Sequence, residues 1–151
     1  YLEENNKTRK NLDGCVFCDA LSQKPSKKNL VLLKGKSAFV IMNRYPYSNG
    51  HLLILPNRHI KDFDKLNKSE HADMAKLMVD CQSILKSVLK CQGFNIGMNI
   101  GSAAGAGIPG HLHYHLVPRW EDDHNFMPIL GDVRVIPEAL EKTYAKLKGK
   151  F

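Results

Sequence analysis

The stretch His111-Leu112-His113-Tyr114-His115-Leu116-Val117 places three histidines two residues apart, with apolar or aromatic residues between them. Successive side chains of a β-strand point to opposite faces, so this stretch predicts three imidazoles on one face and a hydrophobic face behind them. One histidine on a strand is usually a satisfied polar residue, and two can simply share a metal ion. Three in register after the glycine-rich segment 101–110 are hard to explain by packing, so we expect a functional surface backed by a core.

The bulk properties are those of one globular domain. With 151 residues and 43% apolar content, the chain is long enough to bury a single core. Residues 1–13 are polar and charge-rich, which predicts a flexible N-terminal arm in front of a single domain over residues 14–151. The sequence has no apolar run of about 18 residues and no signal-peptide pattern at its start, so we expect a cytoplasmic protein that does not bind membranes.

The formal net charge is +7, and the basic residues are scattered along the chain. Scattered charge is typical of a solvated surface, and it would also attract a polyanionic ligand. The basic residues are not interleaved with aromatic ones as in a nucleic-acid-binding face, so no nucleic-acid partner is expected.

Strand signals lie on both sides of the middle of the chain. The short apolar runs 31–33, 38–42 and 52–55 are separated by turn residues and predict three strands. Residues 94–100 and 111–117 predict a hairpin-like strand pair around the glycine-rich loop.

A helical pattern lies between these two groups of strand signals in the sequence. From residue 68 to about residue 90, apolar residues recur every three or four positions, which predicts a long amphipathic helix. Asn67 and Glu70 resemble a capping box at its start, and Gly93 is a natural stop. Pro137 is expected to open a short final helix, so the elements together predict an α+β protein.

The four cysteines fall into two pairs. Cys15 and Cys18 form a CxxC, which can be redox-active, metal-binding or incidental. Cys81 and Cys91 lie ten residues apart in a helical pattern, a separation of about 15 Å that no disulfide spans. We therefore expect Cys81 and Cys91 to be reduced thiols.

The three histidines are suited to different tasks. A neutral imidazole can attack phosphorus or transfer a proton, and His113 is the central ring of the row. His111 and His115 each lie roughly 7 Å from it along a strand, so they can serve other groups while His113 engages the reacting atom. The neighbouring glycines would let backbone N–H groups approach anionic oxygens closely.

Residues 111–117 resemble the His-φ-His-φ-His-φ-φ signature of the histidine-triad superfamily of nucleotidyl hydrolases and transferases, in which φ is an apolar residue. Residues 43–51 are similar to the family's ribose-binding strand and turn, and the resemblance covers residues 15–119 in order. Residues 117–120 and 125–128 resemble the branch that contains bacterial diadenosine tetraphosphate phosphorylases and hydrolases. The resemblance implies a HIT-like antiparallel sheet of about five strands with one long and one short helix, and a homodimer with a continuous sheet.

The resemblance also implies a reaction. His113 matches the nucleophile that attacks the α-phosphorus of a dinucleoside polyphosphate and forms a nucleotidyl-histidine intermediate, which water or phosphate then resolves. His115 matches a residue that contacts the phosphate oxygens, and His51 matches a histidine beside the site. A nucleoside phosphoramidase, or a zinc-stabilised nucleotide-binding module with little turnover, is the alternative.

Further positions are expected to bind the nucleotide substrate by the same resemblance. They are Asn43 at the ribose hydroxyls, Asn99 near the scissile phosphate, and Val16, Phe17 and Ile41 around the base. Many family members carry Gln and Ser or Thr in the loop before the triad, where this chain has Ala106-Gly107-Ile108. The side-chain hydroxyl is missing here, but we expect the backbone amides of Gly107 and Ile108 to hold phosphate oxygens.

The CxxC gains two partners from the resemblance. His59 and His111 match the remaining ligands of the structural zinc site in zinc-bearing histidine-triad proteins, which would make a closed tetrahedral site with Cys15 and Cys18. A rival assignment places His113 with His111 on the metal and leaves His59 on the surface. We favour His59, because that choice leaves His113 available for attack.

Overall fold

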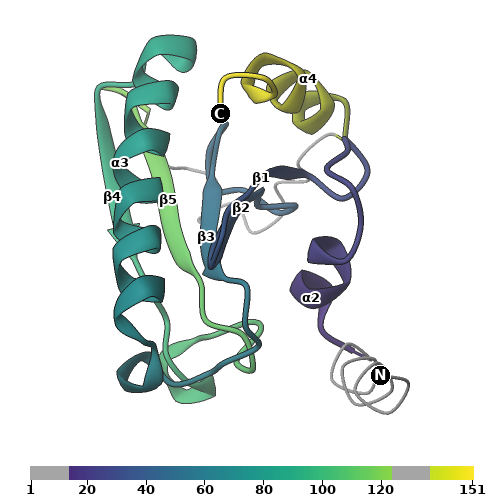
Figure 1. The fold of residues 1–151 in the computed structure, drawn as a ribbon. Helices are drawn as coiled ribbons and strands as arrows, with labels where there is room; N and C mark the ends of the chain where they lie inside the picture. Colours follow the sequence, from purple (N-terminus) through teal and green to yellow (C-terminus); the bar gives the residue numbers. More distant parts are fainter. Residues whose placement is uncertain (1–13, 124–136) are drawn as a thin grey trace.

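The computed structural model of this protein describes residues 14–123 and 137–151 (Figure 1). The arm expected over residues 1–13 and the segment 125–128 lie outside the described residues. Five strands form one antiparallel sheet in the order β1-β2-β3-β5-β4, which confirms the predicted α+β class and strand number. The strands are β1 (Val31–Lys34), β2 (Ala38–Met42), β3 (Leu52–Pro56), β4 (Gly93–Gly97) and β5 (Tyr114–Arg119).

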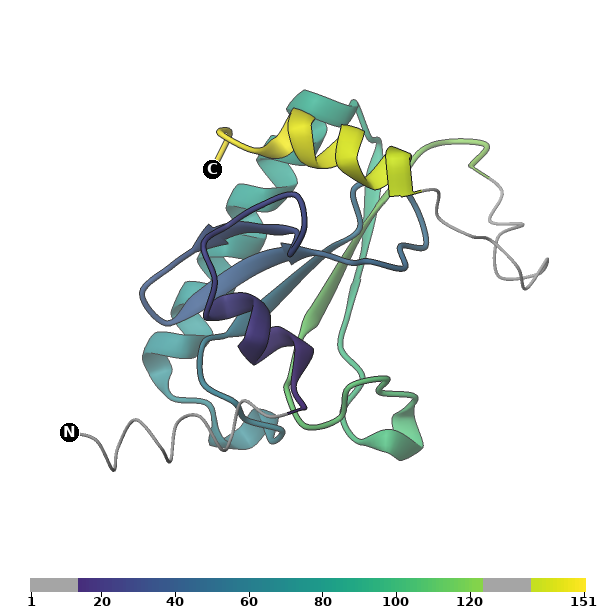
Figure 2. The same ribbon diagram turned by 90° about the vertical axis from the view of Figure 1, so that its right-hand side faces the viewer.

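The sheet is covered on two sides by helices. The long helix α3 (Lys68–Leu89) packs against β2 and β3 on one face, and the short helix α2 (Val16–Leu21) lies over the other (Figure 2). Every residue of β2 and β3 is buried, because both faces of these two strands are covered. This explains why their sequences are continuous apolar runs rather than alternating ones.

Helix α3 begins where the sequence predicts. The Asn67 side chain accepts from the backbone N–H of Glu70, and the Glu70 carboxylate accepts from the backbone N–H of Asn67, so the capping box is complete. Arg58 donates to both carboxylate oxygens of Glu70 and ties the end of β3 to the start of the helix. The predicted stop at Gly93 is wrong: Lys90 takes the left-handed conformation that ends the helix, and Gly93 already begins β4.

The final helix α4 (Pro137–Leu147) confirms the short C-terminal helix. Leu140, Tyr144 and Leu147 are buried, and the Tyr144 hydroxyl donates to the backbone carbonyl of Val31 at 3.0 Å. This contact fixes α4 beside β1, at the top of the view in Figure 1.

Two local differences from the expected elements affect the site. Helix α2 was not expected, because six residues are too few to show helical periodicity. Strand β5 begins at Tyr114 instead of His111, since the Leu112 N–H bonds to the carbonyl of Ile60 rather than to a strand. The histidines therefore occupy an extended segment of which only the last part belongs to the sheet.

Two 3-10 turns complete the described chain, η1 (Phe63–Lys65) before α3 and η2 (Ser102–Ala104) in the glycine-rich loop. Among residues 14–123 and 137–151, no helix is both long enough and apolar enough to cross a membrane. All four cysteines are free thiols, which agrees with the expectation for Cys81 and Cys91, although Cys91 lies beyond the end of α3.

Candidate active site and metal centre

The three histidines of the motif are less exposed than a working surface implies. His111 is fully buried, His113 is 6% exposed and His115 is half-buried. Leu112 and Leu116, on the opposite side of the chain, are buried in the core as expected. Phe17 of α2 packs against His111 and His113, and Tyr47 stacks on His115, so rings from other parts of the chain cover much of the histidine face.

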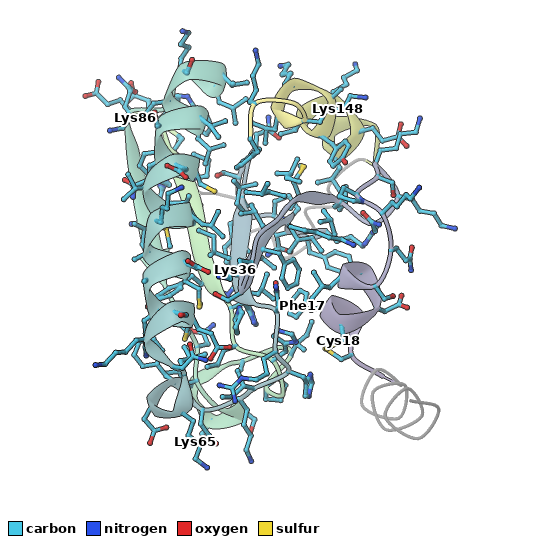
Figure 3. All side chains as sticks on the ribbon, viewed as in Figure 1. Phe17, Cys18, Lys36, Lys65, Lys86 and Lys148 are labelled. Atoms are coloured by element: carbon cyan, nitrogen blue, oxygen red, sulfur yellow. The ribbon has the colours of Figure 1, made fainter. Side chains whose placement is uncertain are left out.

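Phe17 is the side chain through which α2 meets the histidines. Figure 3 shows it pointing from α2 toward the sheet. Its ring centroid lies 5.1 Å from that of His113 and 5.7 Å from that of His111. The helix that carries the CxxC therefore also forms one wall beside the predicted nucleophile.

One hydrogen bond fixes the tautomer of His113. Its Nδ1 lies 2.9 Å from the backbone carbonyl oxygen of His111, which can only accept, so Nδ1 carries the proton. In the neutral ring Nε2 then holds a free lone pair, and the bond also fixes the orientation of the imidazole. A ring nitrogen with a free lone pair can act as a nucleophile.

A second chain of hydrogen bonds fixes His115. The backbone N–H of Tyr47 donates to His51 Nδ1 at 3.2 Å, which places the proton of His51 on Nε2. His51 Nε2 then donates to His115 Nδ1 at 2.9 Å, so His115 carries its own proton on Nε2. His115 thus presents an N–H donor, which is able to bind an anionic oxygen.

Burial keeps these rings neutral. Desolvation, with repulsion from His115 and His113, lowers the pKa of the fully buried His51 to about 3. Burial and the neighbouring His113 also lower the pKa of His115. Both imidazoles are therefore uncharged at neutral pH, as the hydrogen-bond chain requires.

A cavity of about 460 Å³, which we call the α2 cavity, opens between α2 and the sheet. It brings together five of the residues expected to bind substrate, namely Val16, Phe17, Ile41, Asn43 and Ile108. Its wall also contains Asp19, Gln23 and Asn29, which the sequence analysis did not single out. With a mainly apolar interior and a polar rim, the α2 cavity has the character of a site for a flat heterocycle.

A second cavity of about 380 Å³, the β4 cavity, lies against β4 and the end of β5. It contains Asn99 and His115, together with three polar residues that were missed, Tyr47, Asn95 and Arg119. Asn95 and Gly97 share one face of β4 and Asn99 continues the alternation beyond the strand, a pattern that could have revealed Asn95. Gly107 lines neither cavity.

Four side chains converge beside the histidine row in a metal-binding arrangement. The ligand atoms of Cys15, Cys18, His59 and His111 all lie within 4.8 Å of one another. The thiol sulfurs lie 3.4 to 3.6 Å from the Nδ1 atoms of the two imidazoles. His111 Nε2 donates to the carbonyl of Pro56 at 2.8 Å, which leaves its Nδ1 lone pair directed at the sulfurs.

These distances between ligand atoms fit a metal ion with tetrahedral coordination. Zinc bonds of about 2.3 Å to sulfur and about 2.1 Å to nitrogen separate the two ligand atoms by roughly 3.6 Å. Burial and the adjacent Cys15 raise the pKa of Cys18 to about 12, so this thiol needs a cation to ionise. The buried pair of cysteines and the two imidazoles could therefore hold a metal ion.

The rival metal assignment is not favoured by this geometry. His113 is outside the four-residue cluster, and its Nδ1 is occupied by the His111 carbonyl. His59 is inside the cluster and is its one exposed member. The structure thus separates the ring expected to react from the rings expected to bind metal.

A family model and two named relatives show which family this chain resembles. The family model called HIT domain matches residues 24–122, which leaves α2 and the CxxC outside the match. A protein named AP-4-A phosphorylase from Mycobacterium tuberculosis is 37% identical over 123 residues, covering 82% of this chain and 63% of that protein. An asymmetrical bis(5'-nucleosyl)-tetraphosphatase from Schizosaccharomyces pombe is 30% identical over 62% of this chain and 50% of its own length. The chain thus spans less than two thirds of either relative.

The fold is also found in solved structures. A zinc-bound histidine triad family protein from Mycobacterium smegmatis superposes with a TM-score of 0.66 at 25% identity, covering 89% of this chain and 95% of that one. A Hit-like protein from Bartonella henselae gives a TM-score of 0.69 at 17% identity, over 87% and 92% of the two chains.

Proposed function

Since this chain belongs to the HIT domain family, we propose that it cleaves dinucleoside polyphosphates such as diadenosine tetraphosphate at the α-phosphorus. The relatives named as a phosphorylase and a tetraphosphatase support this substrate class. The observation that carries the proposal is the orientation of His113: its Nδ1 proton is held by the His111 carbonyl, and its Nε2 lone pair is left for attack beside the α2 cavity.

The α2 cavity is the proposed site of the nucleoside. Val16, Phe17, Ile41 and Ile108 would enclose the base, in keeping with the mainly apolar and aromatic lining of small-molecule pockets. Asn43 lines the same cavity near His51 and is proposed to bind the ribose hydroxyls. The α-phosphate would then lie between the cavity and the histidine row.

In the first step the Nε2 lone pair of His113 attacks the α-phosphorus. A P–N bond forms, and the bond from phosphorus to the bridging oxygen breaks, so that a nucleoside polyphosphate leaves with that oxygen and its electron pair. The Nε2–H of His115 donates to a non-bridging oxygen and stabilises the charge that develops there. Asn99 and the backbone amides of Gly107 and Ile108 are proposed as further contacts to the phosphates.

In the second step an oxygen of water or of inorganic phosphate attacks the nucleotidyl-histidine. A P–O bond forms, the P–N bond breaks, and His113 recovers its lone pair; where water attacks, it releases a proton to solvent. Water gives AMP, whereas inorganic phosphate gives ADP. His51 positions His115 throughout, because its Nε2–H donates a hydrogen bond to His115 Nδ1 and so keeps the proton of His115 on Nε2.

We propose that the metal centre holds zinc and that its role is structural. Two thiolates and two imidazoles complete a tetrahedral shell without an open position for water. The ion would anchor α2, through Cys15 and Cys18, to the segment that carries His111. The α2 cavity shares this helix, so zinc would also hold the nucleoside site in shape.

We also propose a homodimer and a cytoplasmic location. Strand β4 lies at one edge of the sheet, and Ile96 on it is 49% exposed, so a second copy could continue the sheet and cover this side chain. The four free thiols suit a reducing compartment. Sedimentation of the purified chain tests the dimer, and a single monomeric species would contradict it.

Product analysis tests the proposed reaction. The chain is incubated with diadenosine tetraphosphate in phosphate buffer and in phosphate-free buffer, and the nucleotides are separated by chromatography. ATP with AMP identifies water as the acceptor, while ATP with ADP, formed only with phosphate, identifies a phosphorylase. Absence of turnover in both buffers, or full activity in His113→Ala, would overturn the proposal.

A further inference from the structure

We infer that the α2 cavity accepts a nucleotide whose ribose carries a further phosphate on its 2′ or 3′ hydroxyl, and that Lys28 and Arg44 bind this phosphate. The inference rests on the proposed function, which places a nucleoside in this cavity, and it names a substrate class for that site. Lys28 and Arg44 both line the cavity, and the proposed chemistry at His113 uses neither of them.

Lys28 and Arg44 lie on the far side of Asn43 from the histidines. The Asn43 N–H donates to the backbone carbonyl of His51 at 2.9 Å, so His51 is the neighbour of Asn43 on the side of β3 and β5. Strand β1 pairs with the other edge of β2, and Arg44 Nη2 donates at 2.7 Å to the carbonyl of Lys28, just before β1. The histidines and the two cations therefore lie on opposite sides of Asn43.

A ribose bound at Asn43 would direct its two ends toward these two groups. The α-phosphate is attached through C5′, whereas the 2′ and 3′ hydroxyls lie on the other edge of the sugar ring. If the α-phosphate lies at His113 and His115, the hydroxyls point away from the histidine row. A phosphate on one of these hydroxyls would therefore lie on the side of Lys28 and Arg44.

The guanidinium of Arg44 is held in place without being neutralised. Of the three arginines that the structure describes, Arg58 and Arg119 each pair with a carboxylate. Arg44 forms no ion pair within residues 14–123 and 137–151. Its bond to the Lys28 carbonyl orients the group and uses one of its five N–H donors. A phosphate offers pairs of oxygens that a guanidinium binds in a bidentate manner.

The charges in the cavity wall favour an anion. Lys28 is exposed, and it too has no carboxylate partner in the part of the chain that the structure describes. The wall contains one carboxylate, that of Asp19 on α2, which accepts a hydrogen bond from Gln23 at 3.3 Å. The Asn43 amide, which the ribose would contact, is neutral and does not repel a phosphate. Two cations and one carboxylate thus give the wall a net positive charge.

Calorimetry with AMP and its two ribose-phosphorylated forms tests the inference. The probes are adenosine 3′,5′-bisphosphate and adenosine 2′,5′-bisphosphate, and the readout is the ratio of the Kd for AMP to the Kd for each bisphosphate. These ligands have no leaving group on the α-phosphorus, so binding is measured without cleavage. The wild type should bind one bisphosphate about ten-fold more tightly than AMP, the gain of one charge-assisted contact. The preferred isomer identifies the hydroxyl.

Variants of the two cations show whether they are responsible. Arg44→Gln should bring the ratio close to one, and Arg44→Lys, which keeps the charge without the bidentate geometry, should keep part of it. Lys28→Gln should also lower the ratio. Lys27→Gln is the matched control: it removes the same charge from the same loop but outside the α2 cavity, and it should leave the ratio unchanged. Salt should lower the wild-type ratio, because it screens exposed charges.

Three results would overturn the inference. In the first, the wild type binds neither bisphosphate more tightly than AMP. In the second, the ratio persists in both Arg44→Gln and Lys28→Gln, so these side chains do not bind the added phosphate. In the third, Lys27→Gln lowers the ratio as much as Lys28→Gln does, so the overall charge of the chain accounts for the preference.

Failure of the proposed function gives a different result. A wild type that prefers a bisphosphate through Arg44 but does not cleave diadenosine tetraphosphate would contradict the reaction and support the phosphate subsite. A wild type that cleaves diadenosine tetraphosphate but binds the bisphosphates no better than AMP would contradict the subsite alone.

Discussion

Replacing His51 with glutamine should make the stability of the protein less sensitive to acid. His51 is fully buried and neutral, and its pKa is lowered from 6.5 to about 3 by desolvation and by the neighbouring His115 and His113. In the unfolded chain the same ring takes up a proton near pH 6.5. Between these two values the unfolded state binds one more proton than the folded state, so the free energy of unfolding falls as the pH falls.

The size of this effect follows from the two pKa values. Each pH unit between them removes about 1.4 kcal/mol of stability per proton, so His51 alone should lower the free energy of unfolding by about 2 kcal/mol from pH 7.5 to pH 5. Glutamine does not titrate, and its amide can still accept from the Tyr47 N–H and donate toward His115. His51→Gln should therefore lose about 2 kcal/mol less than the wild type over this range.

The assay is urea denaturation of both proteins at pH 7.5 and pH 5, with the metal content measured in each sample. Metal ligands also take up protons in acid, but they are the same in both proteins and cancel in the difference. An equal loss of stability in wild type and variant would refute the claim that His51 is held neutral by burial.

Three further predictions concern the metal centre and the packing around α3. His59→Ala should lower the zinc content of the protein measured by elemental mass spectrometry, and an unchanged zinc content would contradict the proposed ligands. Chelation of zinc from the wild type should lower its Tm by roughly 10 °C or more, because structural zinc contributes several kcal/mol to the free energy of unfolding. Trp120→Phe removes the hydrogen bond from Nε1 to the carbonyl of Leu89 and should cost about 1 kcal/mol in urea denaturation, with zinc retained. Asn67→Ala removes the acceptor at the start of α3 and should also cost about 1 kcal/mol, whereas Asn67→Ser should keep most of the stability.

The sheet and the long helix could be predicted because their signals are local. β2 and β3 are continuous apolar runs, and α3 combines a capping box at Asn67 with a regular apolar stripe. The limits of elements were harder to predict, because they depend on distant partners. β5 starts late because the Leu112 N–H bonds to Ile60, and Lys90 ends α3 in a conformation that its residue type does not suggest.

In the site, too, local patterns could be predicted and features that depend on distant partners could not. The histidine spacing at 111–115 and the CxxC are local patterns, and their pairing with His59 followed from a family resemblance rather than from physical reasoning. Tyr47, Asn95 and Arg119 were missed because they join the site only when β4 pairs with β5 and the turn before β3 folds over His51. Proton positions on the histidines likewise depend on backbone partners such as the His111 carbonyl, which no sequence pattern specifies.

The central claim is that His113 becomes covalently bound to the nucleotide during the reaction. Mass spectrometry of protein quenched during turnover of diadenosine tetraphosphate tests it most directly. We predict an AMP adduct on the peptide that contains His113, absent when His113 is replaced by alanine. Sustained turnover with no adduct on this peptide, or with the adduct on another residue, would contradict the account.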